Sequence, residues 1–193
     1  MIIDFDLLTV LIGIVMYIIL CLIISRTGKP SKPFYFFSTV FFIYIMAVIK
    51  LTLFPIIMIG LPANLSSSIN LVPFRRGVSK TDLLNVLMTI PFGIIFPFVS
   101  KIRTLIKMSL AGFALGFGIE LLQLAECALT GGFSTRVIDI NDVICNFLGV
   151  VIGYTILYCI ARTISTFSCE KENRFLTYSL TIMGEISKSR STV

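Results

Sequence analysis

Five long apolar stretches constrain this chain more than any other feature of its sequence. A helix needs about 20 apolar residues to cross the hydrocarbon core of a bilayer. Such stretches run over about residues 7–25, 34–59, 83–100, 104–129 and 140–161. Because backbone groups in lipid must be hydrogen-bonded within their own segment, we expect each stretch to be a helix. The sequence therefore predicts an all-α fold, a polytopic membrane helical bundle with five transmembrane helices.

The first apolar stretch is expected to remain in the protein as a membrane span. A cleavable signal peptide begins with a basic region and has a short apolar core. Here the flank carries Asp4 and Asp6, and the apolar core is longer than a signal requires.

Composition excludes several classes of function. Charged residues make up 13% of the chain, about half the share of a soluble domain. The net charge of +6 does not indicate a nucleic-acid partner, because the basic residues form short clusters between apolar stretches, which is the pattern that sets membrane orientation. The chain has no histidine, so it lacks the commonest general base and metal ligand.

The distribution of lysine and arginine predicts the orientation. Most of the 16 basic residues flank the spans on one side, and the side rich in lysine and arginine is cytoplasmic. The N-terminus is then outside and the C-terminus is in the cytoplasm. The basic residues on the predicted cytoplasmic side are Arg26, Lys29, Lys32, Lys101, Arg103, Lys107, Arg162, Lys171, Arg174, Lys188 and Arg190.

The chain is expected to have one membrane domain, residues 1–167, followed by a cytoplasmic tail, residues 168–193. The tail is rich in serine and threonine, and we expect it to be mobile. The loop at 61–81 is long for a helical bundle. It either lies over the outer surface or dips back into the bundle, and the sequence does not decide between these paths.

Three spans carry polar residues and glycines at helical spacing, three or four residues apart. The glycines are expected deep in the membrane and the polar residues towards the outer surface. The three sets are Asp82, Asn85, Thr89 and Gly93; Gly112, Gly116, Glu120 and Gln123; and Asp142, Asn146, Gly149 and Gly153.

Two pairings between the spans follow from this arrangement. Glycines four residues apart let helix backbones approach closely in lipid, so we expect the pairs at 112–116 and 149–153 to bring the fourth and fifth spans together. Lys50 and Glu120 each lie sixteen residues into their spans, at a similar depth of about 24 Å. A lone charge there is costly, so we expect either a Lys50–Glu120 pair or a shared water-filled cleft.

These polar residues are predicted to line a pocket that opens to the outside. More ordinary roles remain open. Asp139 could cap a helix, Asn85 and Asn146 could bond a neighbouring helix, and the arginines could contact lipid head groups. The candidate ligand-binding residues are Lys50, Asn70, Arg75, Arg76, Asp82, Asn85, Glu120, Gln123, Arg136, Asp139, Asp142 and Asn146.

Six short motifs resemble those of one known family. They are KLTLFP at 50–55, NLVPF at 70–74, LLN at 83–85, IPFG at 90–93, IELLQ at 119–123 and RVIDINDVICNFLG at 136–149. In this order they resemble the VanZ-like (teicoplanin-resistance) integral membrane proteins, over about residues 50–158. The resemblance implies a multi-pass protein of a bacterial cell membrane, in a family whose members include some that lower susceptibility to teicoplanin, an acylated glycopeptide.

Two mechanisms are compatible with these residues. We expect a binding protein rather than an enzyme, with a polar pocket and Phe-rich walls that take an amphiphilic glycopeptide or a lipid-linked cell-wall precursor. The alternative is a membrane-embedded enzyme that modifies a lipid-linked envelope substrate, with Glu120 as candidate general acid or base. A transporter is disfavoured, because no internal inverted repeat is present.

No cofactor is expected. No metal site is predicted either, although Asp139 and Asp142 have the oxygen ligands that a hard divalent cation prefers. The expected partners are membrane lipid and the amphiphilic ligand, and a homo-oligomer is left open.

Overall fold

A computed structural model describes residues 2–28, 30–58, 69–75, 77–130, 138–165 and 174–188. The helices in these ranges are α1 (Leu7–Gly28), α2 (Lys32–Leu53), α3 (Lys80–Val99), α4 (Leu105–Leu129), α5 (Ile140–Ser165) and α6 (Arg174–Lys188). Two-residue strands form two small sheets at the helix ends. They are β1 (Ile2–Ile3), β2 (Ile56–Ile57), β3 (Ile69–Asn70) and β4 (Ile138–Asp139).

The first five helices confirm the predicted membrane bundle. Within the described residues, α1 to α5 are the helices long and apolar enough to cross a membrane. The predicted second span was wrong at its end, because α2 stops at Leu53 and not near residue 59. Pro55 has no backbone N–H and disfavours the helical conformation at Phe54. The chain therefore leaves the helix there and forms β2.

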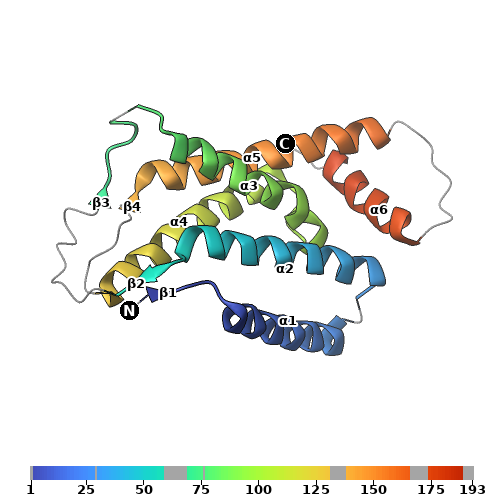
Figure 1. The fold of residues 1–193 in the computed structure, drawn as a ribbon. Helices are drawn as coiled ribbons and strands as arrows, with labels where there is room; N and C mark the ends of the chain where they lie inside the picture. Colours follow the sequence, from blue (N-terminus) through green and yellow to red (C-terminus); the bar gives the residue numbers. More distant parts are fainter. Residues whose placement is uncertain are drawn as a thin grey trace.

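The strands gather at one end of the bundle, here called the strand end (Figure 1). There β1 pairs with β2 in antiparallel fashion, and β3 pairs with β4 in parallel. The helices α1, α3 and α5 begin at the strand end, and α2 and α4 finish there. Helix α6 lies near the opposite end.

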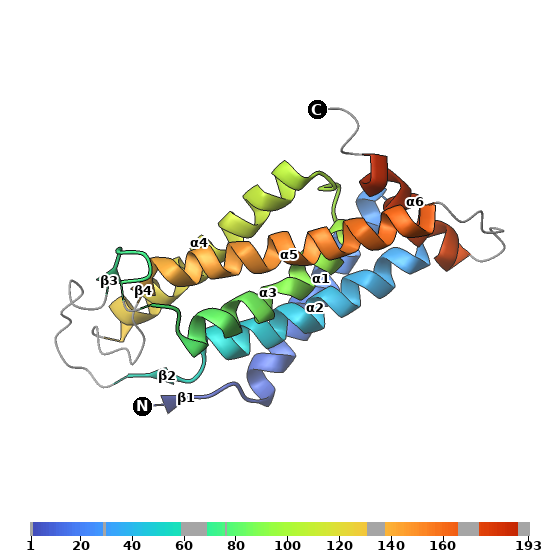
Figure 2. The same cartoon turned by 90° about the horizontal axis from the view of Figure 1, so that it is seen from above.

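Helix α5 is the central helix of the bundle. It lies between α3 and α4 (Figure 2) and makes its most extensive contacts with these two helices. Its side chains supply much of the core: Val150, Tyr154, Leu157 and Ala161 are each at most 2% exposed. Polar residues at the start of α5 are therefore surrounded by protein rather than by lipid.

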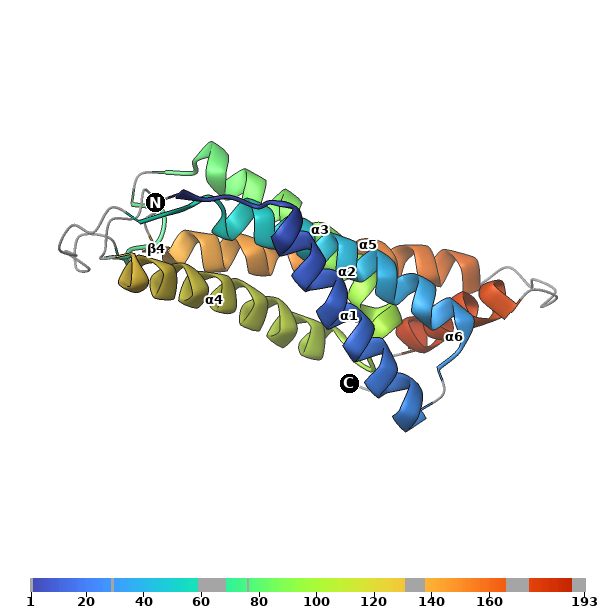
Figure 3. The same ribbon diagram turned by 60° about the horizontal axis from the view of Figure 1, so that its bottom comes forward.

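Helix α1 lies at the edge of the bundle and crosses α2 (Figure 3). No described residue of α1 is buried. Its contact with α2 includes a hydrogen bond of 2.9 Å between the hydroxyls of Tyr17 and Thr39 and a stacked Tyr17–Phe42 pair. The remaining apolar surface of α1 is exposed, as expected for a helix that faces lipid.

The expectation of a mobile tail was wrong for residues 174–188, which form α6 and pack against the bundle. Ile182 and Ile186 are at most 2% exposed and belong to the main apolar core. The Tyr178 hydroxyl donates to the Phe98 carbonyl oxygen at 2.5 Å, and Arg103 forms an ion pair with Glu185. The apolar residues at helical spacing outweigh the serine and threonine content of this segment.

The glycine pairs bring helices together, but the predicted partner was wrong for one of them. A Cβ on Gly116 would lie 2.9 Å from the Val143 carbonyl oxygen of α5, so the α4 glycines do face α5. A Cβ on Gly153 would instead lie 2.0 Å from the Ile90 carbonyl oxygen of α3. Gly149 and Val150 are neighbours in sequence, about 100° apart around the helix. Consequently the α5 glycines face α3, while Val150 faces Gly112 of α4.

The close contact between α3 and α5 predicts an asymmetry between two glycines. Gly153→Ala should destabilise the protein by about 1–3 kcal/mol, because the new methyl group would overlap the α3 backbone. Gly118→Ala is the matched control, since a Cβ there meets nothing within 4 Å. Thermal unfolding of both variants in detergent measures the difference. Equal stabilities would contradict this packing.

A carboxylate-lined cavity as the candidate functional site

A cavity of about 820 Å³ opens at the strand end between α2, α3, α4, α5 and β4. Its walls combine carboxyl, amide and hydroxyl groups with aliphatic side chains. The lining residues are Leu51, Thr52, Ser79, Thr81, Asp82, Leu84, Asn85, Leu87, Met88, Gln123, Asp139 and Asp142. The described apolar walls are thus aliphatic, and the expected Phe-rich walls are not seen: Phe92 lies in the core.

The start of α3 fixes one wall of the cavity through a capping box. The Asp82 backbone N–H donates to the Ser79 hydroxyl at 3.1 Å. In return, the Ser79 backbone N–H donates to the Asp82 carboxylate at 2.7 Å. Asp82 is only 4% exposed, so this carboxylate caps the helix and also lines the cavity.

Asp139 joins three parts of the chain. Its Oδ2 accepts from the Asn70 side-chain amide at 3.0 Å, and Asn70 is its partner in the β3–β4 register. Its Oδ1 accepts from the backbone N–H of Asn141 at 2.9 Å. Its own backbone N–H donates to Glu120 Oε2 at 3.0 Å. The predicted capping role of Asp139 is therefore combined with a tie between β3, α4 and the start of α5.

Asn141 is a structural site residue that the predicted set omitted. Its side-chain oxygen accepts from the Phe74 backbone N–H at 2.8 Å. Phe74 has a φ of 51°, a left-handed conformation that is uncommon for a residue other than glycine. The position of Asn141 between Asp139 and Asp142 in the RVIDIND motif was the signal that could have identified it.

The facing sides of α3 and α5 place amide groups against carboxylates. The Asn85 amide of α3 and the Asp142 carboxyl group of α5 line the same cavity. One turn deeper, the Thr89 hydroxyl lies 2.9 Å from the Asn146 carbonyl oxygen. Asn146 is 1% exposed, and its Oδ1 has no hydrogen-bond partner among the described residues.

Glu120 is a second acid that is almost fully buried beside the cavity. It is 4% exposed, and its Oε2 accepts the hydrogen bond from Asp139. Its Oε1 is buried and has no hydrogen-bond partner in the described part of the chain. A buried carboxyl oxygen without a donor is costly and marks the site as a functional candidate.

Gln123 connects α4 to the end of α2. Its side-chain amide donates to the Thr52 carbonyl oxygen at 2.9 Å. Thr52 and Gln123 both line the cavity, so this bond closes the side of the cavity that faces α4. Helix α2 ends within two residues of Thr52, which leaves this carbonyl without a helical N–H partner.

The structure separates the predicted site residues into groups. Five line the cavity: Asp82, Asn85, Gln123, Asp139 and Asp142. Asn70 and Glu120 contact it through Asp139, and Asn146 lies one turn below Asp142. Arg75 is exposed and does not line the cavity. Arg76 and Arg136 lie outside the described residues.

The expected Lys50–Glu120 pair was wrong. Lys50 is exposed, and its Nζ lies 5.8 Å from the centre of the Phe5 ring. The ion pair of the described residues joins Arg103 and Glu185 at the other end. Residues two apart on a helix point about 200° apart. Thr52 faces the cavity, so Lys50 faces away from it.

The carboxylates of the cavity are not clustered as metal ligands. No group of three His, Cys, Asp or Glu side chains within the described ranges could hold a metal ion. The carboxylates of Asp139 and Asp142 nevertheless have oxygen atoms of the kind that coordinate a hard cation. The described lining thus offers carboxyl oxygens beside the amide groups of Asn85 and Gln123.

Comparison with known proteins gives one match. The model of the VanZ/LLP1 family matches residues 41–162, a range that includes α3, α4 and most of α5. No curated protein and no solved structure matches the chain.

The tie between β3 and β4 predicts an energetic coupling between Asn70 and Asp139. In a double-mutant cycle, Asn70→Ala and Asp139→Ala should couple by about 1 kcal/mol, because they share a hydrogen bond. Asn70→Ala with Asp82→Ala is the control cycle, since Asp82 bonds Ser79 instead. Free energies of unfolding in detergent give both couplings. A coupling for Asn70 and Asp139 no larger than the control would argue against this tie.

Proposed function

The chain belongs to the VanZ/LLP1 family, whose model covers more than half of it, and we propose on that basis that it is a binding protein of the bacterial plasma membrane. Its strand-end cavity takes an amphiphile at the outer surface. The ligand is a teicoplanin-type lipoglycopeptide or a lipid-linked cell-wall precursor. Sequestering either one lowers susceptibility to the drug.

The observation that carries this proposal is the composition of the cavity. It is large enough for the head of an amphiphile, at about 820 Å³. Its floor offers carboxylates and amides, and its wall offers aliphatic side chains. Sites for small molecules combine apolar walls with a few placed polar groups.

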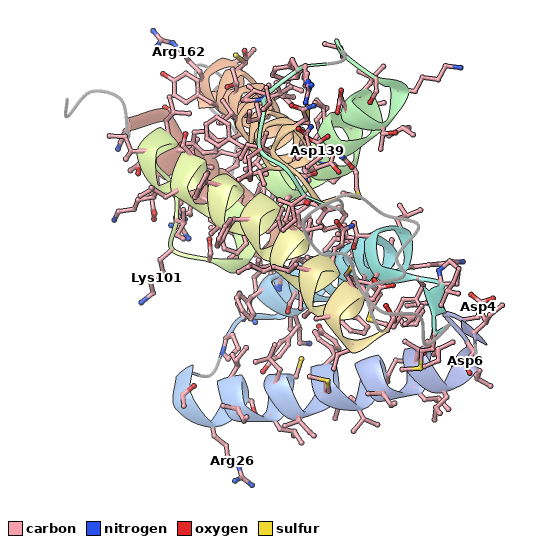
Figure 4. All side chains as sticks on the ribbon, turned by 90° about the vertical axis from the view of Figure 1, so that its left-hand side faces the viewer. Asp4, Asp6, Arg26, Lys101, Asp139 and Arg162 are labelled. Atoms are coloured by element: carbon pink, nitrogen blue, oxygen red, sulfur yellow. The ribbon has the colours of Figure 1, made fainter. Side chains whose placement is uncertain are left out.

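The charges at the two ends of the bundle support an outward-facing cavity. Most acidic residues lie where the strands are, and most basic residues flank the opposite ends of the helices. Figure 4 looks from the strand end, where Asp139 lies between the helices and Asp4 and Asp6 lie beside α1. The side rich in lysine and arginine is cytoplasmic, and this distribution supports a cavity that faces the outside. The basic residues labelled in Figure 4 are Arg26, Lys101 and Arg162.

One observation favours an enzyme as the second candidate. Glu120 is buried and its Oε1 has no partner among the described residues, which leaves this oxygen free to give or take a proton. The substrate would be a lipid-linked envelope molecule in the same cavity. This alternative needs a proton to move at Glu120, whereas binding needs only its hydrogen bond to Asp139.

Expression in a susceptible bacterium tests the binding proposal. The protein should raise the inhibitory concentration of teicoplanin more than that of vancomycin, because only the acylated drug offers an apolar chain. Asp142→Ala should abolish the difference, and Asp4→Asn, an exposed acid outside the cavity, should preserve it. Equal protection against both drugs would contradict the proposal.

Glu120→Gln separates the two candidates. Glutamine keeps the shape and can still accept the hydrogen bond from Asp139, but it cannot transfer a proton. The binding proposal predicts that teicoplanin protection is retained at matched membrane expression. Loss of protection in this variant would support the enzyme.

A further inference from the structure

The described lining of the cavity carries acids and no basic side chain. Asp82, Asp139 and Asp142 line it, and no lysine or arginine does so among the described residues. Lys50, on the neighbouring α2, points away towards Phe5. Carboxylates without a counter-charge are expensive at membrane depth.

The hydrogen bonds already present do not supply positive charge. Asp139 accepts from the Asn70 amide and a backbone N–H, and Asp82 accepts from the Ser79 backbone. The Asn85 amide lines the cavity together with Asp142. These donors orient the carboxylates but remain neutral, so a cation in the cavity would gain charge-assisted bonds.

A fourth acid lies directly behind the cavity wall. Glu120 Oε2 accepts a hydrogen bond from the backbone N–H of Asp139, which fixes the carboxyl group against the β4 wall of the cavity. The other oxygen, Oε1, is buried without a partner in the described part of the protein. Glu120 is 4% exposed and is not among the residues that line the cavity. It therefore adds an acid next to the three aspartates without contacting the ligand.

The wall between α2 and α3 faces lipid as well as the cavity. Leu51, Leu84 and Leu87 all line the cavity, yet they are 68%, 62% and 53% exposed. All three lie within membrane-spanning helices. In a membrane their exposed surfaces contact acyl chains, so the cavity has an apolar edge that opens sideways into the bilayer.

We infer that the cavity selects an amphiphile with a cationic head group, an ammonium or guanidinium, which enters sideways between α2 and α3 and leaves its apolar chain in the outer leaflet. This inference rests on the proposed function and specifies its ligand. The head group lies among Asp82, Asp139 and Asp142, and the chain passes the three leucines.

A pair of matched probes tests the charge. The full chain, in micelles of a neutral maltoside detergent, is photolabelled with a diazirine-bearing long-chain primary amine or with its N-acetyl derivative. The two share one chain and differ in charge. The amine should label the protein saturably with at least about tenfold higher affinity, on peptides that include Leu51, Leu84 or Leu87. Labelling by the two probes with equal affinity, or on α1 alone, would overturn the inference.

Two variants locate the charge that matters. Asp142→Asn should weaken amine labelling about tenfold, whereas Asp4→Asn, which removes an acid at the same end but outside the cavity, should leave it unchanged. If Asp142→Asn fails to fold, the comparison of the two probes on the wild-type chain still tests whether the cavity prefers a cationic head group. Competition by Mg²⁺ or Ca²⁺ alone at the labelled site would instead indicate a metal site and overturn the inference.

The outcome is distinguishable from that of the proposed function. If the protein protects against teicoplanin but both probes label it equally, the binding proposal is supported and the inference of a cationic head group is rejected. If the amine labels the protein selectively but the protein gives no protection against the drug, the proposed role in resistance is rejected and the inferred preference for a cationic head group is supported.

Discussion

The close contact between α3 and α5 is the constraint on which the rest of the structure depends. The contact has glycine at positions 93, 149 and 153. The two backbones are therefore so close that a Cβ atom at any of these positions would overlap the opposite helix. That approach brings the polar turns above it together, with Asn85 beside Asp142 and Thr89 beside the Asn146 carbonyl. Bulky residues at these positions would separate the helices and expose the polar groups to lipid.

Among the described residues, the sites next to this contact are connected through hydrogen bonds from backbone and side-chain amides rather than through ion pairs. Asp139 links β3, α4 and α5, and Asn141 fixes the turn at Phe74. Neutral donors position these carboxylates, and no basic side chain among the described residues lines the cavity. The same residues thus stabilise the strand end and, under the proposed function, contact the ligand.

The sequence was sufficient for the fold class and for much of the site, because long apolar runs and polar residues at helical spacing are local signals. Asp82, Asn85, Gln123 and Asp142 were predicted from spacing alone and line one cavity. Errors arose where a result depends on the rotation of one helix against another. Lys50 faces away from the cavity because Thr52 faces it, and the α5 glycines face α3 rather than α4. The helix α6 was missed because its segment is rich in serine and threonine, although its apolar residues recur at helical spacing.

The most direct test of the central claim is disulfide formation between Asn85→Cys and Asp142→Cys, in a chain whose five native cysteines are replaced by serine. If polar groups of α3 and α5 converge at the strand end, mild oxidation in membranes should cross-link this pair. Leu83→Cys with Asp142→Cys should stay open, since Leu83 is 58% exposed and does not line the cavity. Cross-linking of the Leu83 pair without the Asn85 pair would contradict the convergence of these residues.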